Sequence, residues 1–302
     1  MENIIELLGQ FQMPVIAGLV AGGLCPLMGI FFVMRRMVLL GIALPQVGSA
    51  GVAFIIMIAQ LMKLQVLQPG QSPFLAERTA VTLAPFGAVA AILLMLLFLA
   101  WCEARSPFAE ARWGTVYVTS AALLILFLVI NPYAEAHIAT LVEGRIITVT
   151  AAQLRILLGA AVVVAILFLL FRKEILLSSF DPEMAISLGL RPSRWDGLLY
   201  LLMGLVISTG VMSMGPLFVF GYLLLPAFAV RPWVAGLKRF ALFSVILGIV
   251  SAFVGSLIGF WFDWPLGPAE VAAAALFLFA SRLFHLLYRT VVLKRKKVAA
   301  SL

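Results

Sequence analysis

Residues 197–230 read GLLYLLMGLVISTGVMSMGPLFVFGYLLLPAFAV and contain no Asp, Glu, Lys or Arg. As one helix, this stretch would extend about 50 Å at about 1.5 Å per residue, whereas the hydrocarbon core of a bilayer is about 30 Å thick. Gly215-Pro216 lies near its middle, and proline removes a helical hydrogen bond. The stretch therefore predicts two short membrane spans, 197–214 and 217–230, with one span plus a re-entrant half-helix as the alternative.

Seven further stretches are apolar enough to form membrane spans: 7–34, 37–62, 79–102, 113–134, 149–171, 240–262 and 268–288. A span needs about 20 predominantly apolar residues, so each stretch holds one. The chain has 302 residues, of which 64% are hydrophobic and 11% charged, whereas soluble domains carry about 25% charged residues. We therefore expect an all-α, polytopic membrane helical bundle of about nine spans (eight to nine), forming a single transmembrane domain over 1–302.

The basic residues indicate how this bundle is oriented. With nine spans and the basic tetrad 294–297 inside, the inner segments are 35–36, 102–112, 172–196, 231–239 and 282–302. Only four of the 21 Lys and Arg residues fall outside these segments: Lys63, Arg78, Arg145 and Arg155. Because cytoplasmic loops carry the excess of Lys and Arg, the pattern favours two spans in 197–230 and a cytoplasmic C-terminus. A net charge of +8 spread in this way does not indicate nucleic-acid binding.

The second span carries polar groups near mid-membrane depth. Pro45 opens the helix, Gln46 follows it, and Ser49 lies one turn further on. A polar side chain in lipid must be hydrogen-bonded or face a wet cavity. These residues therefore line a substrate pathway or, alternatively, form hydrogen bonds between helices. Tyr222 in the seventh span has two interpretations as well, lining the pathway or packing in the core.

An outer loop, 131–152, holds Glu135, His137 and Glu143. Carboxylate and imidazole groups together can receive a transition metal, so Glu135 and His137 are candidate metal ligands. All three residues form a candidate outer capture site for the substrate. The alternative is that they are solvated loop groups or contacts for a docking partner.

An inner loop, 172–196, contains a local helix signal. Asp181-Pro182-Glu183 has the pattern of a helix start, with Asp as N-cap, Pro at the first helical position and an acidic first turn. We expect this short helix to end near Gly189. Membrane topology alone requires no ordered element here, so the loop predicts a contact with a partner protein. A second predicted contact is the loop 231–239, with three basic residues: Arg231, Lys238 and Arg239.

Four motifs resemble those of the ABC-3 family, the permeases of zinc, manganese and iron importers. They are RRMVLLG at 35–41 followed by Ala43-Leu44 and Gly51-Val52-Ala53, GRIITVT at 144–150, FDPEMAISLGL at 180–190, and Gly215-Pro216-Leu217 running on to Leu225-Pro226-Ala227. The resemblance extends over about residues 12–290. The four motifs occur in the family's order and on the expected sides of the membrane.

The resemblance implies an ABC type II importer-like permease in the bacterial cytoplasmic (inner) membrane. Two copies of the chain would form the pathway, two separate ATP-binding subunits would dock on the inner loops, and a periplasmic or lipoprotein solute-binding protein would deliver substrate. The implied ATPase contacts are Asp181, Pro182, Glu183, Ala185, Leu188, Gly189, Arg231, Lys238 and Arg239. The sequence has no G-x-x-x-x-G-K-[ST] phosphate loop, so we expect a non-enzymatic subunit that binds no cofactor, with ATP on the partner.

The sequence departs from the family at two pathway positions. Members commonly have an acidic residue just after the glycine that matches Gly41 and a histidine four residues further on, whereas this chain has Ile42 and Gln46. Zinc prefers Cys, His and carboxylate ligands. The expected substrate is a divalent metal ion, and the alternative is a non-metal or chelated substrate on the same fold. An ion-driven secondary transporter is a lesser alternative. Such proteins keep ionisable residues at mid-membrane, whereas the mid-membrane positions of this chain lack Asp, Glu, Lys and Arg almost throughout.

Overall fold

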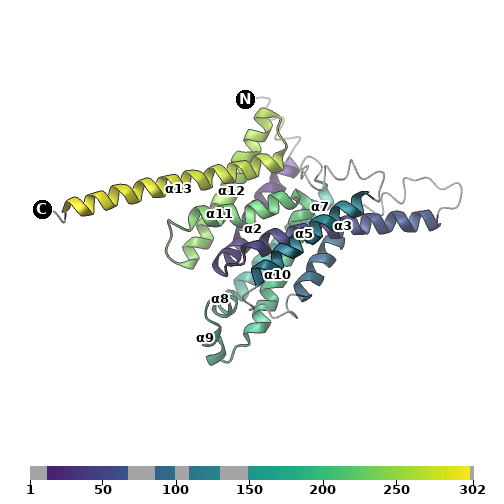
Figure 1. The fold of residues 1–302 in the computed structure, drawn as a ribbon, viewed down its shortest axis with the longest axis horizontal. Coiled ribbons are helices and arrows are strands. Elements are labelled where there is room, and N and C mark those ends of the chain that lie inside the picture. Colours follow the sequence, from purple (N-terminus) through teal and green to yellow (C-terminus); the bar gives the residue numbers. More distant parts are fainter. Residues whose placement is uncertain (1–11, 67–85, 99–108, 130–148, 300–302) are drawn as a thin grey trace.

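In the computed structural model, the described residues are 12–66, 86–98, 109–129 and 149–299, and they form helices with no strand among them (Figure 1). The helices are α2 (Gln12–Met34), α3 (Val38–Val66), an unlabelled helix (Phe86–Phe98), α5 (Ala109–Val129), α7 (Ala151–Leu170), α8 (Arg172–Phe180), α9 (Pro182–Ser187), α10 (Pro192–Met214), α11 (Pro216–Val230), α12 (Leu237–Phe262) and α13 (Leu266–Ala299).

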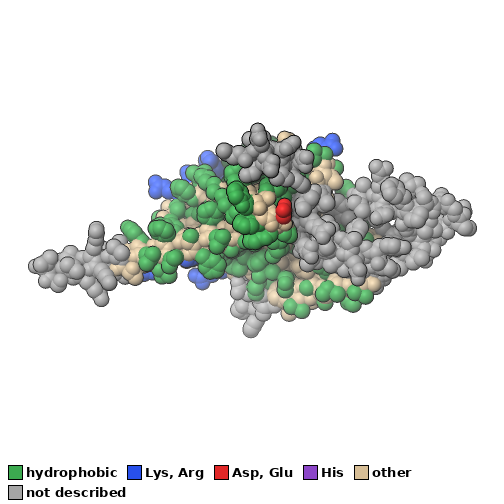
Figure 2. All heavy atoms as spheres, turned by 90° about the horizontal axis from the view of Figure 1, so that it is seen from above, with side chains coloured by type: hydrophobic (Ala, Val, Ile, Leu, Met, Phe, Trp, Pro, Cys, Tyr) green, Lys and Arg blue, Asp and Glu red, His purple; other side chains and the backbone are tan. Residues whose placement is uncertain are grey.

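The apolar helices agree with the predicted membrane bundle. Among the described residues, six helices are long and apolar enough to cross a membrane, and three shorter apolar helices accompany them: Phe86–Phe98, Arg112–Phe127 and Pro216–Val230. Each of the nine falls in a stretch that the sequence assigns to a span. Figure 2 shows one face of the molecule covered mainly by hydrophobic side chains, with Lys and Arg toward its margins. The prediction of an all-α polytopic fold is confirmed.

The long apolar stretch 197–230 is broken at Gly215, as predicted. Gly215 has φ 83°, a left-handed value that glycine adopts without strain, and Pro216 begins the next helix. Gly210 lies against the side chain of Val219, so α10 and α11 form a helical hairpin. The first helix of the pair differs from the expectation in one respect: α10 begins at Pro192 rather than at 197, because a proline at the first position favours helix initiation.

The helix directions gather the basic segments at one end of the bundle. The beginnings of α2 and α13 meet, since Gly18 lies against the Glu270 side chain. Helix α10 runs antiparallel to α2, because its last residue, Met214, lies near Gly18 and its first turn reaches Arg35. Because α10 and α11 form a hairpin, the C-terminus of α11 lies on the same side of the bundle as the N-terminus of α10. Segments 35–36, 172–194 and 231–239 therefore share one end, in agreement with two passes through 197–230.

Helices α2 and α10 form the centre of the bundle. In an 18-residue apolar segment of each of these two helices, 72% of the residues are buried, compared with 17% for α7 and 11% for α13. Glycines allow the central helices to approach closely: a Cβ at Gly29 would overlap the Leu223 carbonyl of α11, and one at Gly248 would overlap the Gly22 carbonyl of α2. Small residues serve this purpose in membrane bundles, where van der Waals packing drives helix association. The outward faces of α7 and α13 carry exposed apolar side chains suited to lipid.

Candidate transport pathway and partner contact

The predicted pathway residues of α3 lie on one stretch of an unbroken helix. The helix continues through buried Pro45, and the buried Ser49 hydroxyl donates a 3.0 Å hydrogen bond to the Pro45 carbonyl. Ser49 therefore uses its proton within its own helix rather than between helices. Ile42 and Gln46 are half-buried, and their spacing of four residues places them on one face. These two side chains are the members of the group that retain exposed surface.

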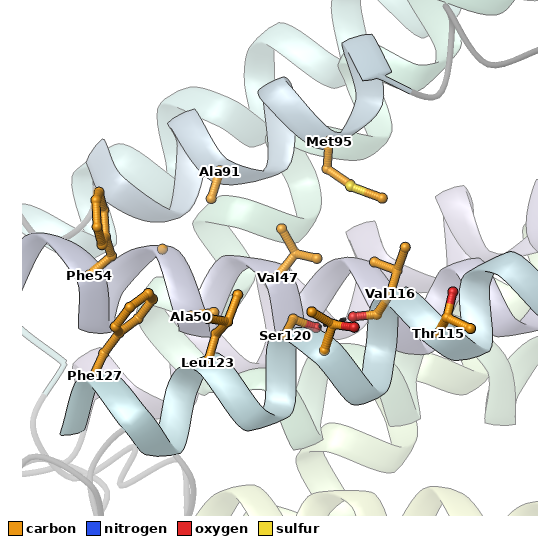
Figure 3. Close-up of a pocket in the computed structure, with 12 residues that line it drawn as sticks. Val47, Ala50, Phe54, Ala91, Met95, Thr115, Val116, Ser120, Leu123 and Phe127 are labelled. Atoms are coloured by element: carbon orange, nitrogen blue, oxygen red, sulfur yellow. Dashed lines mark hydrogen bonds between the residues drawn. The ribbon is translucent and has the colours of Figure 1, made fainter. Parts of the chain in front are cut away.

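A hollow of about 370 Å³ lies beside this stretch, between α3, the helix Phe86–Phe98 and α5 (Figure 3). Its walls are mainly apolar, with hydroxyls on the α5 side. The Ser120 hydroxyl donates to the Val116 carbonyl at 2.7 Å, so it is satisfied within its helix. The lining residues are Val47, Ala50, Gly51, Phe54, Ala91, Met95, Thr115, Val116, Thr119, Ser120, Leu123 and Phe127. None of them is a carboxylate or an imidazole, so this hollow does not have the donor set of a metal site.

Tyr222 lies in the packed core rather than with the α3 residues. Its side chain is fully buried and stacks on Phe218 with ring centroids 4.1 Å apart. The phenol hydroxyl donates to the backbone carbonyl of Glu270 at 3.2 Å and lies 3.4 Å from the Ser251 hydroxyl. The polar tip of Tyr222 is thus directed toward α12 and α13.

Glu270 is a buried residue that sequence reasoning missed. The expected span boundary placed it near a membrane surface, whereas the structure gives its side chain no exposed area. Its Oε1 lies 2.6 Å from the Ser256 hydroxyl, and Oε2 has no hydrogen-bond partner among the described residues. The available signal was the stretch 264–281, in which Glu270 is the only charged residue. An isolated carboxyl in an apolar membrane segment marks a functional position by default.

The short helix α9 forms as predicted. The Asp181 carboxylate accepts a 2.9 Å hydrogen bond from the Met184 backbone N–H, and Pro182 occupies the first position. Gly189 has φ 79°, and the following residue, Leu190, donates to the Ala185 carbonyl, which is the Schellman ending of a helix. The local structure expected from Asp181-Pro182-Glu183 is therefore confirmed.

Helix α9 presents apolar groups at the basic end of the bundle. Ala185 is fully buried, whereas Met184, Ile186 and Leu188 are exposed by 53%, 63% and 63%. Glu183 is also exposed. At the same end of the bundle, segment 231–239, which leads from the end of α11 into the first turn of α12, exposes three basic side chains: Arg231, Lys238 and Arg239. A solvent-exposed cluster of large apolar side chains such as that on α9 is typical of a protein-binding surface.

Arg35 connects this end of the bundle to α2. Its Nη2 donates to the Ser179 hydroxyl of α8 at 2.6 Å and to Asp196 Oδ1 of α10 at 2.5 Å. The guanidinium also lies 5.8 Å from the Tyr200 ring. The Ser178 hydroxyl donates to the Pro192 carbonyl, which fixes α8 to the start of α10. These contacts join α8 and the start of α10 to the residue that directly follows α2.

The described residues contain no group of three or more His, Cys, Asp or Glu side chains that could hold a metal ion. Glu135, His137 and Glu143 lie outside the described residues. The structure thus places no complete metal site within 12–66, 86–98, 109–129 or 149–299.

An apolar helical bundle with an exposed short helix at its basic end agrees with the predicted polytopic membrane protein. The chain belongs to the ABC 3 transport family, whose sequence model matches residues 9–285. The manganese import system permease protein ScaB of Streptococcus gordonii is 26% identical over 283 residues, covering 93% of this chain and 91% of that protein. A probable iron transport system membrane protein of Haemophilus influenzae is 28% identical over 216 residues, covering 70% and 75%.

The fold also has a counterpart among solved structures. The structure of PsaBC from Streptococcus pneumoniae in complex with Fab superposes with a TM-score of 0.74 at 23% identity, covering 93% of this chain and 94% of that chain. The family predicted from the four motifs and the all-helical permease fold are both confirmed.

Proposed function

We propose that this chain is the permease subunit of an ATP-driven importer that moves a divalent metal ion of the zinc, manganese and iron class. The observation that carries the proposal is the family match over 9–285, together with a relative named for manganese import that is matched over 91% of its length and one named for iron transport that is matched over 75%. Two copies form the pathway, two ATP-binding subunits drive it, and a solute-binding protein delivers the ion. The protein resides in the bacterial inner membrane with its C-terminus in the cytoplasm.

The partner contact proposed for the ATP-binding subunits is α9 with the α11–α12 connection. Support comes from the exposed apolar side chains of α9 and from the Arg35 bridge that joins α8 and α10 to α2. Closure of the ATP-binding subunits would push α8 and α9, and the bridge would pass this displacement to the end of α2. The contact residues are Asp181, Pro182, Glu183, Ala185, Leu188, Gly189, Arg231, Lys238 and Arg239.

A pull-down of the permease with its ATP-binding subunit tests this contact. Ile186→Asp or Leu188→Asp should reduce recovery of the ATP-binding subunit at least tenfold, because a charge would enter an apolar interface. Trp264→Asp is the matched control, since Trp264 is also exposed but lies in the α12–α13 turn at the opposite end of the bundle. Equal recovery with all three variants would refute the contact.

The proposed pathway passes the α3 residues Ile42, Pro45, Gln46 and Ser49, with Tyr222 lining it when the core opens. Glu135, His137 and Glu143 are the proposed outer capture site. Ile42 and Gln46 retain exposed surface in the structure, which supports their place beside the pathway. Neither is a strong metal ligand. This chemistry, and the lack of a metal-binding cluster in the described segments, favour a second candidate substrate, a chelated or non-metal solute carried by the same fold.

Uptake by proteoliposomes containing the assembled transporter distinguishes these substrates. We expect ATP-dependent accumulation of at least one of radiolabelled manganese, zinc or iron as the free ion, and Gln46→Trp should abolish it by narrowing the pathway. Leu94→Trp, on the exposed face of the helix Phe86–Phe98, is the matched control and should transport normally. Accumulation of chelated metal alone would establish the second candidate, and accumulation of neither form would overturn the metal assignment.

A further inference from the structure

Glu270 occupies a dry contact among four helices. Its side chain has no exposed area, and Ser256, which it contacts, is 1% exposed. A Cβ added at Gly18 of α2 would lie 2.9 Å from Oε1, and one added at Gly255 of α12 would overlap the Glu270 backbone. Gly18 therefore brings α2 directly against the carboxyl group, and Gly255 brings α12 against the base of the side chain. The carboxyl group is enclosed by protein rather than by a water-filled cavity.

The hydrogen bonds around Ser256 show where the protons lie. Ser256 Oγ is 2.9 Å from the Ala252 carbonyl oxygen and 2.6 Å from Glu270 Oε1, and both are hydrogen-bond distances. A serine hydroxyl has one hydrogen, and a carbonyl oxygen can only accept. If Ser256 donates to Ala252, the 2.6 Å contact requires a hydrogen on the Glu270 carboxyl. If Ser256 instead donates to Glu270, the carboxyl can be ionised, but the Ser256 hydroxyl is then the single hydrogen-bond donor to it among the described residues.

The ionised arrangement is the more costly one. Oε2 has no donor among the described residues, and burying a charge without compensating hydrogen bonds is strongly unfavourable. The titratable group facing this site from the packed helices is Tyr222 on α11, whose phenol is uncharged. Tyr222 donates its proton to the Glu270 backbone carbonyl rather than to the carboxylate. The described side chains that α10 and α12 bring near this site include Met214, Ser251 and Ser256, and none of these three carries a charge.

We propose that Glu270 is a proton-binding site inside the membrane bundle. The carboxyl carries a proton that it donates to Ser256 Oγ, and Ser256 in turn donates to the Ala252 carbonyl. The bound proton is the ligand that allows α13 to pack against α2 and α12. This site goes beyond the proposed transport function, because it involves neither the α3 residues nor the partner contact.

Proton binding at Glu270 should make the stability of the fold depend on pH. An unfolded chain exposes Glu270 to water, where a glutamate is ionised near neutral pH. The folded protein then holds one proton more than the unfolded chain. Because of this site, the unfolding equilibrium constant should rise about tenfold per pH unit from pH ~5 up to the pH at which the carboxyl ionises in the folded protein, so that stability falls over that interval and no further above it. Glu270→Gln removes this contribution while keeping the shape of the side chain and a donor for Ser256.

Infrared spectroscopy of the full chain in detergent tests the protonation directly. The wild type should show the C=O stretching band of a protonated carboxylic acid at pH 7, and the band should be absent from Glu270→Gln. Glu183→Gln, which removes an exposed carboxyl from α9, should leave the band unchanged. Ser256→Ala should shift the band, because the carboxyl loses its acceptor, and this variant keeps the test valid if Glu270→Gln does not fold.

Three results would overturn the proposal. The first is a wild-type spectrum with no acid band sensitive to Glu270→Gln. The second is an acid band that Ser256→Ala does not shift. The third is a carboxylate band assigned to Glu270 at pH 7, which would indicate a bound metal or alkali cation in place of the proton.

Discussion

Removing the Arg35–Asp196 interaction should destabilise the basic end of the bundle by a measurable amount. The Arg35 side chain is 12% exposed and the Asp196 side chain 25%. A hydrogen bond to a charged group contributes about 1.5–3 kcal/mol, and breaking a fully buried ion pair costs about 3–5 kcal/mol. Because water reaches Asp196, we expect a loss near the lower range, about 2 kcal/mol, for Asp196→Ala.

This loss can be measured as thermal unfolding in detergent. At about 2–4 °C per kcal/mol for a chain of this size class, Asp196→Ala should lower Tm by about 4–8 °C. Arg35→Ala should lower it by a similar amount. The double variant should lose about 1.5–2 kcal/mol less than the sum of the two single losses, because the second substitution removes a group that is already unpaired. Asp263→Asn removes an exposed carboxylate at the other end of the bundle and should leave Tm within about 1 °C.

Additive losses in the double-variant cycle would refute this account of the bridge. The two side chains would then act independently, and the bridge could not transmit motion from α8 and α10 to α2. A second contradiction would be that the double-variant cycle gives the expected interaction energy between Arg35 and Asp196, while both single variants keep unchanged ATP-driven transport. In that case the bridge would stabilise the fold without taking part in coupling.

Two further changes test the packing of the described helices. Gly29→Ala should lower the free energy of unfolding by about 3 kcal/mol or more, because the added Cβ would overlap the Leu223 carbonyl. Gly159→Ala, where open space surrounds the added Cβ, should be neutral or slightly stabilising. Equal Tm values for the two variants would contradict the close approach of α2 and α11. Asp181→Ala should cost about 1 kcal/mol of local stability by removing the cap on Met184 N–H, and faster amide exchange confined to α9 would show it; unchanged exchange would mean that the cap contributes nothing.

Local signals predicted much of the fold. Uncharged runs located the nine apolar helices, Gly215-Pro216 located the break between α10 and α11, and Asp181-Pro182 located α9. Each of these depends on residues close together in the chain.

Contacts between distant helices could not be predicted in this way. Arg35 and Asp196 are 161 residues apart, and no property of either residue indicates the other. Glu270 lies at the start of the predicted span 268–288, and that position gave no sign of its burial. Its burial depends on Gly18 and Gly255, which allow the distant helices α2 and α12 to pack against it. The pathway residues of α3 were predicted from resemblance and chemistry, and their role awaits the transport experiments above.

The unequal burial of the helices has a consequence for how this sequence can change over generations. Lipid accepts almost any apolar side chain, so the outward positions of α7 and α13 can exchange Leu, Phe, Ile and Val at little cost. Positions on α2 and α10 meet another helix on nearly every side, and few replacements fit there. A saturation library selected for folding should therefore be strongly depleted along α2 and α10 and almost undepleted along the outward face of α13.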